Sequence, residues 1–390
     1  MKSLYISIIT IYCVAMTAIV NARPYLPDND DFVLAVLPFK PSQSGPSDID
    51  RLKQNLKSDP KNRLVAIELA KRYLEMAKQT SDPRYYGLAE TVIKPWWNDS
   101  ADLDLMMLKA NVLEFDHKFL EALTVLNNVI KIHNHSQAIL MRANINQIIG
   151  RYDLVKRDCT QLISDTSALI VASCLFSVDG FTSGPESTKT LISKLRDLLA
   201  ISNVKNVEVQ LWSLGLLAET ASLNGYWPLA EELLITGLDI KQDDTYLLSL
   251  YADLLLKQAR FQDTVDLLQP FIEQTSLLVR FLVANSQMLA TTTYRVQQKN
   301  LDMRIREDEI KGDQRHLREY AYYQLYVKHN KEIALQNALI NWENQKELID
   351  SLILYRAAFD LNRLDVLQML AVWRDDNNVK IDFAAQSLKI

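Results

Sequence analysis

Glycine is scarce in this chain. Only 9 of its 390 residues are Gly, roughly a third of what an average usage of about 7% predicts. Gly supplies the positive-φ turns that sheets, phosphate loops and tight hairpins need. The scarcity therefore argues against a Rossmann or β-sandwich protein. Abundant Leu, Ala, Lys, Gln and Glu, in a chain that is 48% hydrophobic, favour helices instead.

An excess of positive charge and catalytic motifs are also lacking. The net charge is −5 and no basic block is visible, so the basic footprint of a nucleic-acid-binding protein is missing. The sequence contains no G-x-S-x-G, P-loop or H-E-x-x-H motif. We therefore expect a protein that is not an enzyme, holds no cofactor or metal and does not bind nucleic acid.

The N-terminus carries an export signal. Lys2 precedes an uncharged run over residues 3–20, and Val20-Asn21-Ala22 offers small residues before a cut at Arg23. These features predict a secretory signal peptide, residues 1–22, and hence an exported, periplasmic protein. The alternative is an uncleaved anchor, because the run approaches the ~20 residues of a membrane span. Only in that case would we expect contact with a membrane.

The rest of the chain divides by composition and pattern. A proline-punctuated linker, 23–47, is followed by a helical array, 48–285, in which apolar residues recur at three and four spacings. Residues 286–375 begin with long charged helices and end in hairpins that cap the array. Residues 376–390 form a tail.

Within the array, small residues recur at a fixed spacing. Ala122 follows Ala110 at the twelfth position, and Phe119 stands three before Ala122. The same pattern recurs at Ala218, Trp227 and Ala230. Two antiparallel helices approach closely only where side chains are small, so each alanine pair marks the crossing of one helix hairpin. The aromatic residue is expected to plug the end of the hairpin.

The hairpins repeat along the chain. Ala143 follows Ala110 at the thirty-third position, and Ala252 follows Ala218 at the thirty-fourth. A hairpin cannot bury its own apolar face, so neighbouring hairpins must stack into one core. The fold class is therefore predicted to be all-α, a right-handed α-solenoid superhelix of antiparallel helix hairpins. A fourth, degenerate unit near 167–200 is expected to carry a loop from Asp179 to Glu186.

This pattern resembles the tetratricopeptide-repeat (TPR) family from about residue 48 to 375. More narrowly, the chain resembles a group of exported bacterial TPR proteins, and this resemblance implies fold and export without implying an activity. The stretches that carry it are DPRYYGLAETVIKPWW (82–97), DDTYLLSLYADLLLKQARF (243–261), HLREYAYYQL (316–325) and NWENQKELIDSLILYRAA (341–358). The chain departs from the family where His117 and Ala259 replace a usual Gly and Asn134 replaces an inter-repeat Pro.

Two cysteines remain after the signal peptide. Cys159 falls in the second helix of one unit and Cys174 in the first helix of the next. Such helices are neighbours in stacked repeats, so the two Cα atoms could lie within the ~4.4–6.8 Å that a disulfide needs. An exported protein favours the bridge. The alternative is two buried thiols that behave as small apolar residues.

A peptide-binding groove is predicted from the register of the repeats. First helices line the concave side of such arrays, and the residue after each small residue points into the groove. Asn111 and Asn144 are separated by the same repeat period as Ala110 and Ala143, so their amides could track one peptide backbone. The full candidate set is Asn111, Asn144, Gln147, Trp212, Glu219, Tyr246 and Asp253. The alternative is that these are ordinary solvated residues of the groove.

Three functions follow from these observations. The first is a non-catalytic protein–protein interaction scaffold outside the cytoplasm that binds a peptide or protein segment in its groove. The second is a membrane-tethered assembly or transport accessory factor, which requires an uncleaved N-terminal segment. The third is a hydrolase or metal enzyme hidden in the groove. His133 and His135 flank Asn134 as candidate metal ligands, but no Cys or carboxylate stands near them at the spacing of a zinc site.

Overall fold

The fold is described by a computed structural model in which every regular element of the described residues is a helix. The described residues are 48–80, 82–99, 101–202, 206–288 and 292–388. The expected signal peptide (1–22) and linker (23–47) lie outside them. Within this part of the chain the prediction of an all-α protein is confirmed.

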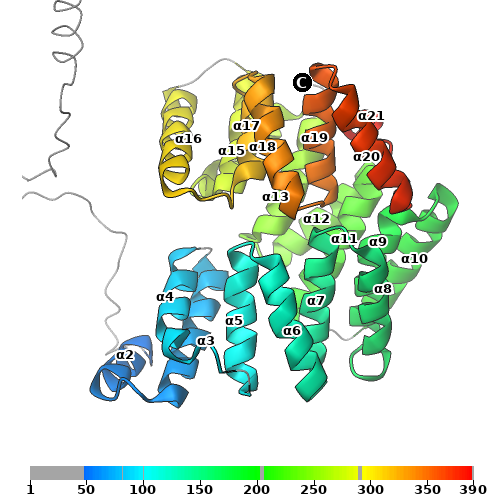
Figure 1. Cartoon of the computed structure of the whole chain (residues 1–390). Helices are drawn as coiled ribbons and strands as arrows, with labels where there is room; N and C mark the ends of the chain where they lie inside the picture. The colour runs from blue at the N-terminus through cyan, green and yellow to red at the C-terminus, as the bar shows by residue number, and fades with distance from the viewer. Residues whose placement is uncertain (1–47, 81, 100, 203–205, 289–291, 389–390) are drawn as a thin grey trace, which may run out of the picture. The chain divides into compact units, whose positions relative to one another are not determined.

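Consecutive helices pack as hairpins, and the hairpins stack in chain order (Figure 1). A single helix, α2 (Asp48–Ser58), precedes the first hairpin. The hairpins are α3 (Arg63–Thr80) with α4 (Arg84–Ile93), α5 (Leu103–Phe115) with α6 (Phe119–His133), α7 (Ser136–Ile148) with α8 (Tyr152–Gln161), α9 (Ala168–Thr182) with α10 (Pro185–Ile201), α11 (Val207–Leu223) with α12 (Trp227–Ile240), α13 (Thr245–Lys257) with α14 (Phe261–Leu268), α15 (Thr275–Ser286) with α16 (Thr292–Lys311), α17 (Leu317–Tyr326) with α18 (Lys331–Asn344), and α19 (Leu348–Asp360) with α20 (Leu364–Asp376). A short helix, α21 (Phe383–Gln386), follows.

The contacts between hairpins are those of an α-solenoid. Second helices pack against the first helix of the next hairpin, as α6 does on α7 and α12 on α13. From α9 to α19 the first helices also pack against one another in sequence. Stacking of this kind gives each hairpin the apolar neighbour that it cannot supply itself.

The recurring alanines occupy the predicted crossings. Ala110 and Ala122 are both fully buried, and Phe119 beside them is 4% exposed. Ala218 and Ala230 are buried in the same way, but Trp227 is 42% exposed. The prediction that Trp227 plugs its hairpin is therefore wrong, because this ring lies at the exposed tip of the turn between α11 and α12.

The unusual turn residues adopt a backbone conformation that favours Gly. His117 and Ala259 have φ of 57° and 56°, in the left-handed region that costs a residue with a Cβ atom about 1–2 kcal/mol. Asn134 ends α6 with φ 44°. Proline cannot occupy that position, because its ring holds φ at a negative value.

The fourth hairpin is more regular than its sequence predicts. The expected loop from Asp179 to Glu186 is wrong: α9 continues to Thr182, and α10 starts at Pro185. The Thr182 hydroxyl donates to the Val178 carbonyl at 3.0 Å and so supports the last turn of α9. Gly180 lets this turn approach α11, since a Cβ atom there would stand 2.5 Å from the Thr220 hydroxyl.

The residues between α18 and α19 contact hairpins far earlier in the chain. The Lys346 N–H donates to the Ile148 carbonyl at 2.6 Å, and the Tyr152 hydroxyl donates to the Lys346 carbonyl at 3.3 Å. The Gln345 side chain hydrogen-bonds His117 Nδ1 at 2.9 Å. We call these the closing contacts, because they join the eighth and ninth hairpins to the second and third.

A second set of distant contacts comes from residues 378–388, which we call the C-terminal strap. The Lys380 N–H donates to the Phe181 carbonyl at 2.9 Å, and Gln386 Nε2 donates to the Leu223 carbonyl at 2.9 Å. Phe383 is 4% exposed and is part of the same core as residues of α8, α9 and α19. The last carbonyls of a helix have no partner within it, so the strap caps the C-terminal ends of α9 and α11.

Candidate functional site

A pocket of about 260 Å³ lies among the first helices of the second to fifth hairpins. Residues of α5, α7 and α9 form most of its wall, and α8 and α11 contribute one residue each. Its lining residues are Asn111, Glu114, Gln137, Leu140, Met141, Ala143, Asn144, Gln147, Val155, Cys174, Ser177 and Trp212. Four of the seven predicted groove residues are thus brought together here: Asn111, Asn144, Gln147 and Trp212.

The pocket combines polar acceptors with an apolar wall. It has one carboxyl group, Glu114, and four side-chain amides, and its lining includes no Lys, Arg or His. Leu140, Met141 and Val155 supply aliphatic surface, and Trp212 supplies an aromatic ring. Such a mixture binds by apolar contact and fixes orientation through a few polar groups.

Glu114 is the electrostatic centre of the pocket. Asn144 Nδ2 donates to Glu114 Oε1 at 3.0 Å, which joins α5 to α7 across the pocket. Burial raises the pKa of Glu114 to about 7, although the Asn144 hydrogen bond and the charge of Lys78 act in the opposite direction. Its carboxyl group therefore titrates near pH 7, and no Lys or Arg in the part of the chain that the structure describes forms an ion pair with it.

The two asparagines are oriented by different partners. Asn111 Nδ2 donates to the Met107 carbonyl of its own helix at 2.8 Å, whereas Asn144 donates to Glu114. Among the described residues, each amide group therefore donates one N–H to a partner and keeps its carbonyl oxygen and a second N–H available. Gln147 Nε2 donates to the Ser177 carbonyl at 3.3 Å and so ties α7 to α9.

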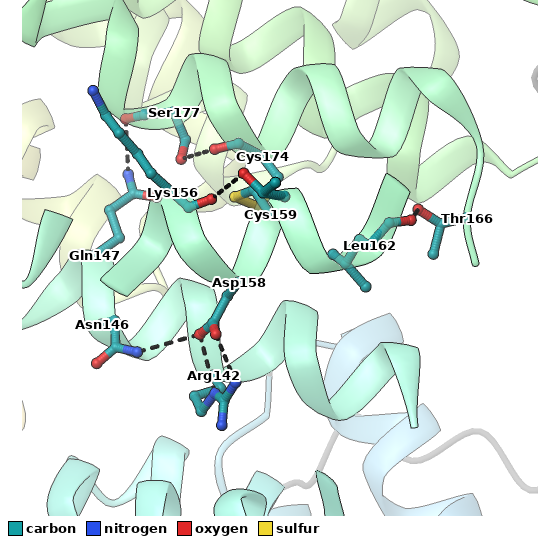
Figure 2. Close-up of a disulfide and its surroundings, with 11 residues drawn as sticks. Arg142, Asn146, Gln147, Lys156, Asp158, Cys159, Leu162, Thr166, Cys174 and Ser177 are labelled. Atoms are coloured by element: carbon teal, nitrogen blue, oxygen red, sulfur yellow. Dashed lines mark hydrogen bonds and ion pairs between the residues drawn. A yellow bond between two sulfur atoms is a disulfide. The ribbon is translucent and has the colours of Figure 1, made fainter. Parts of the chain in front are cut away.

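The two predicted disulfide cysteines adjoin this pocket, since Cys174 is one of its lining residues. Figure 2 shows the pair with Gln147 and Ser177, which also line the pocket. Cys159 of α8 and Cys174 of α9 are 0% and 2% exposed, and their sulfur atoms are at bonding distance with Cα atoms 5.6 Å apart. Ser177, one turn after Cys174, donates its hydroxyl to the Cys174 carbonyl at 2.8 Å. The bridge joins α8 to α9, both of which contribute residues to the pocket.

An ion pair stiffens the same region (Figure 2). Arg142 Nη2 and Nε lie 2.6 and 3.0 Å from the two oxygens of Asp158. Arg142 Nη1 donates to Asn127 Oδ1 at 2.8 Å, so one side chain connects α6, α7 and α8. Asn146 Nδ2 lies 3.5 Å from Asp158, while the buried Asn146 Oδ1 has no partner among the described residues.

Glu219 and Tyr246 contact each other and do not line the pocket. The Tyr246 hydroxyl donates to Glu219 Oε2 at 3.3 Å. The Tyr246 ring packs against α11 at Gly215, where a Cβ atom would stand only 2.3 Å from the ring. Burial raises the pKa of Glu219 to about 7, and the negative charge of Glu347 adds to this effect.

Asp253 has a structural role instead. Arg280 Nε and Nη2 donate to its two carboxylate oxygens at 2.8 and 2.7 Å, which joins α15 to α13. The Tyr322 hydroxyl of α17 lies 3.5 Å from the same carboxylate. Both Asp253 oxygens are therefore engaged by other hairpins, which the equivalent position in sequence did not reveal.

The histidines do not come together in a metal site within the described part of the chain. His133 ends α6 and His135 precedes α7, and no group of three or more His, Cys, Asp or Glu in the described ranges is placed to hold a metal ion. His117 lies in the closing contacts, where burial and the nearby Arg318 lower its pKa to about 4. It is therefore neutral at pH 7.

No helix among the described residues is both long and apolar enough to cross a membrane.

Comparison with known proteins gives little more. No protein-family model matches the chain, and no curated protein sequence matches it. Among the solved structures that match, the TPR domain of P58(IPK) has 13% sequence identity, covers 76% of this chain and 99% of its own, and gives a TM-score of 0.22. The α-solenoid architecture follows from the helix contacts described above.

Proposed function

We propose that this protein is a non-catalytic interaction scaffold that binds a peptide or protein segment at the pocket between α5, α7, α9 and α11. One observation carries the proposal: Asn111 and Asn144, one repeat period apart in sequence, line one pocket together with Gln147 and Trp212. Amides that retain a donor and an acceptor suit the backbone of an extended peptide, and Trp212 offers area for a side chain.

A hidden hydrolase is the weaker proposal for the same pocket. A carboxyl group with a pKa near 7 suits general acid–base catalysis. Hydrolysis also needs a nucleophile or an activated water. Among the described residues, the side chain that hydrogen-bonds Glu114 is the amide of Asn144, which is not a nucleophile. The geometry therefore supports binding better than catalysis.

The binding proposal is tested with a partner captured by the protein from extract of its own host. Asn111→Ala with Asn144→Ala should weaken the captured partner's affinity at least tenfold in a titration of purified components. Asn128→Ala is the matched control, because Asn128 lies exposed on α6 of the same hairpin as Asn111. Equal affinities for all three proteins would reject this pocket as the binding site.

We also propose that the protein acts outside the cytoplasm, most simply in the periplasm, as the resemblance to exported bacterial TPR proteins implies. The N-terminal pattern over residues 1–22 supports export, and a buried Cys159–Cys174 pair suits an oxidising compartment. N-terminal sequencing of the protein recovered from its host tests this. A start at Arg23 supports a secreted scaffold, whereas a start at Met1 in the membrane fraction supports the tethered accessory factor.

A further inference from the structure

We infer that the segment bound at this pocket presents a Lys or Arg side chain, whose cationic head group lies beside Glu114. The inference rests on the proposed function, since it names the chemistry of the partner that the scaffold binds. Its basis is a pocket with negative charge, acceptor oxygens and an aromatic face, lined by no residue of positive charge.

The charges around the pocket are not balanced by the protein itself. Glu114 is its one carboxyl group, and no Lys or Arg among the described residues pairs with it. Lys78 of α3 exerts a favourable charge effect on Glu114, and Tyr86 of α4 is the other titratable group that senses it. A recessed carboxylate without a paired cation is costly, so a cation brought by a ligand satisfies a group that the fold leaves unbalanced.

The other lining residues fit the same head group. Gln137 and Gln147 carry amide oxygens that can accept hydrogen bonds from an ammonium or guanidinium group. Leu140 and Met141 suit the aliphatic stem, and Trp212 adds apolar area on the α11 side of the pocket.

The size of the pocket favours a side chain over a free small molecule. Its volume of about 260 Å³ is below the range of roughly 300–1,000 Å³ for pockets that enclose drug-sized ligands. A single long side chain can enter while its backbone remains outside. There the backbone would meet the exposed Asn144.

The probe is a displayed library of random nine-residue peptides, selected on the protein as it is recovered from its host. Selected peptides should share a Lys or Arg at one position. Replacing that residue by norleucine should weaken binding at least tenfold, and Glu114→Gln should cause a similar loss. Glu121→Gln, an exposed carboxyl on α6, removes the same charge at the surface and should change affinity less than twofold.

Proton linkage gives a second measurement. With a pKa of about 7, the ionised fraction of Glu114 rises about tenfold between pH 6 and pH 8. Binding of a Lys peptide should therefore strengthen by up to about tenfold over this range, and the dependence should disappear in Glu114→Gln. Glu219, which titrates in the same range, remains present in both proteins and so serves as an internal reference.

The outcomes separate the two proposals. Selected peptides that lack Lys and Arg, or that bind Glu114→Gln as tightly as the wild type, overturn the cationic head group but leave the scaffold standing. If no peptide is enriched, the scaffold proposal falls and this inference falls with it. If n-butylammonium alone competes as well as the best peptide, the pocket recognises a small amine, and the assignment to a peptide side chain is wrong.

Discussion

Arg318 is predicted to hold the last hairpins together, and its loss should destabilise them strongly. Its Nε and Nη2 donate to the two oxygens of Asp350 at 2.6 and 2.9 Å, and Nη2 also donates to Gln345 at 2.9 Å. Glu347 pairs with the same guanidinium. The Asp350 side chain is 1% exposed, so Arg318→Met leaves a buried carboxylate without its cation.

The expected cost can be bounded from the remaining partners of Asp350. Removing one member of a buried ion pair costs about 3–5 kcal/mol. Asn341 Nδ2 still donates to Asp350 at 2.8 Å, and the Glu347 N–H still donates at 2.9 Å, which places the expected loss near the lower limit, about 3 kcal/mol. Because residues 345–346 make the closing contacts, protection against hydrogen exchange should also fall around Ile148 and Tyr152.

Urea unfolding and hydrogen exchange measure these two effects. Arg374→Met is the control, since Arg374 and Asp375 form an exposed pair at 3.2 Å worth at most about 1 kcal/mol. Arg318→Met combined with Asp350→Leu should recover most of the loss, because both charges are then removed. A single variant that loses less than about 1 kcal/mol, or a double variant no better than the single one, refutes this account.

Three further predictions concern separate features. Ala259→Gly should raise the free energy of unfolding by about 1 kcal/mol, because it relieves the left-handed φ of 56°. Ala252→Gly, inside α13, should lower the free energy of unfolding by about 1 kcal/mol. Urea titrations in which both variants change stability in the same direction contradict this prediction. Glu219 has a pKa of about 7 in the folded state and of about 4.3 in the unfolded chain. The free energy of unfolding should therefore fall as pH rises from 4.5 to 7. Glu219→Gln should remove up to about 3 kcal/mol of that fall, and parallel stability–pH curves for the two proteins would exclude it. Replacing Cys159 and Cys174 by Ala should cost about 3 kcal/mol, as for a closed loop of about 15 residues, and an unchanged urea midpoint would show that the bridge has no structural role.

The regular part of the fold is predictable from sequence because it depends on contacts between helices that follow one another along the chain. Ala110 and Ala122 reveal a crossing, since only small residues allow two helices to approach there, and both are fully buried. His117 and Ala259 mark turns where Gly is usual, and both adopt a positive φ. The prediction for Trp227 is wrong because it uses only the position of this residue in the repeat. Whether a side chain at a hairpin tip is exposed also depends on the conformation of the turn before it.

For a similar reason, the sequence predicts some residues of the candidate site and not others. Asn111 and Asn144 occupy equivalent positions, and the stacking of adjacent hairpins brings them to one pocket. Asp253 occupies an equivalent position too, but Arg280 from another hairpin engages it. The repeat period predicts which face of each helix points into the groove. It does not predict which residue of a distant hairpin will contact that face. The contact between Tyr152 and Lys346, 194 residues apart, lies beyond that information.

The closing contacts change how this array can evolve and fold. In an open solenoid each repeat contacts only its neighbours, so units can be gained or lost and folding can start anywhere. Here His117 meets Gln345 across 228 residues, and Lys380 meets Phe181. Deleting one hairpin between them would move these partners out of register, so the number of repeats is fixed as it is in a closed ring. The contacts of the C-terminal strap also form only after residues 378–388 have been synthesised, so hairpins made much earlier receive their last packing partner late.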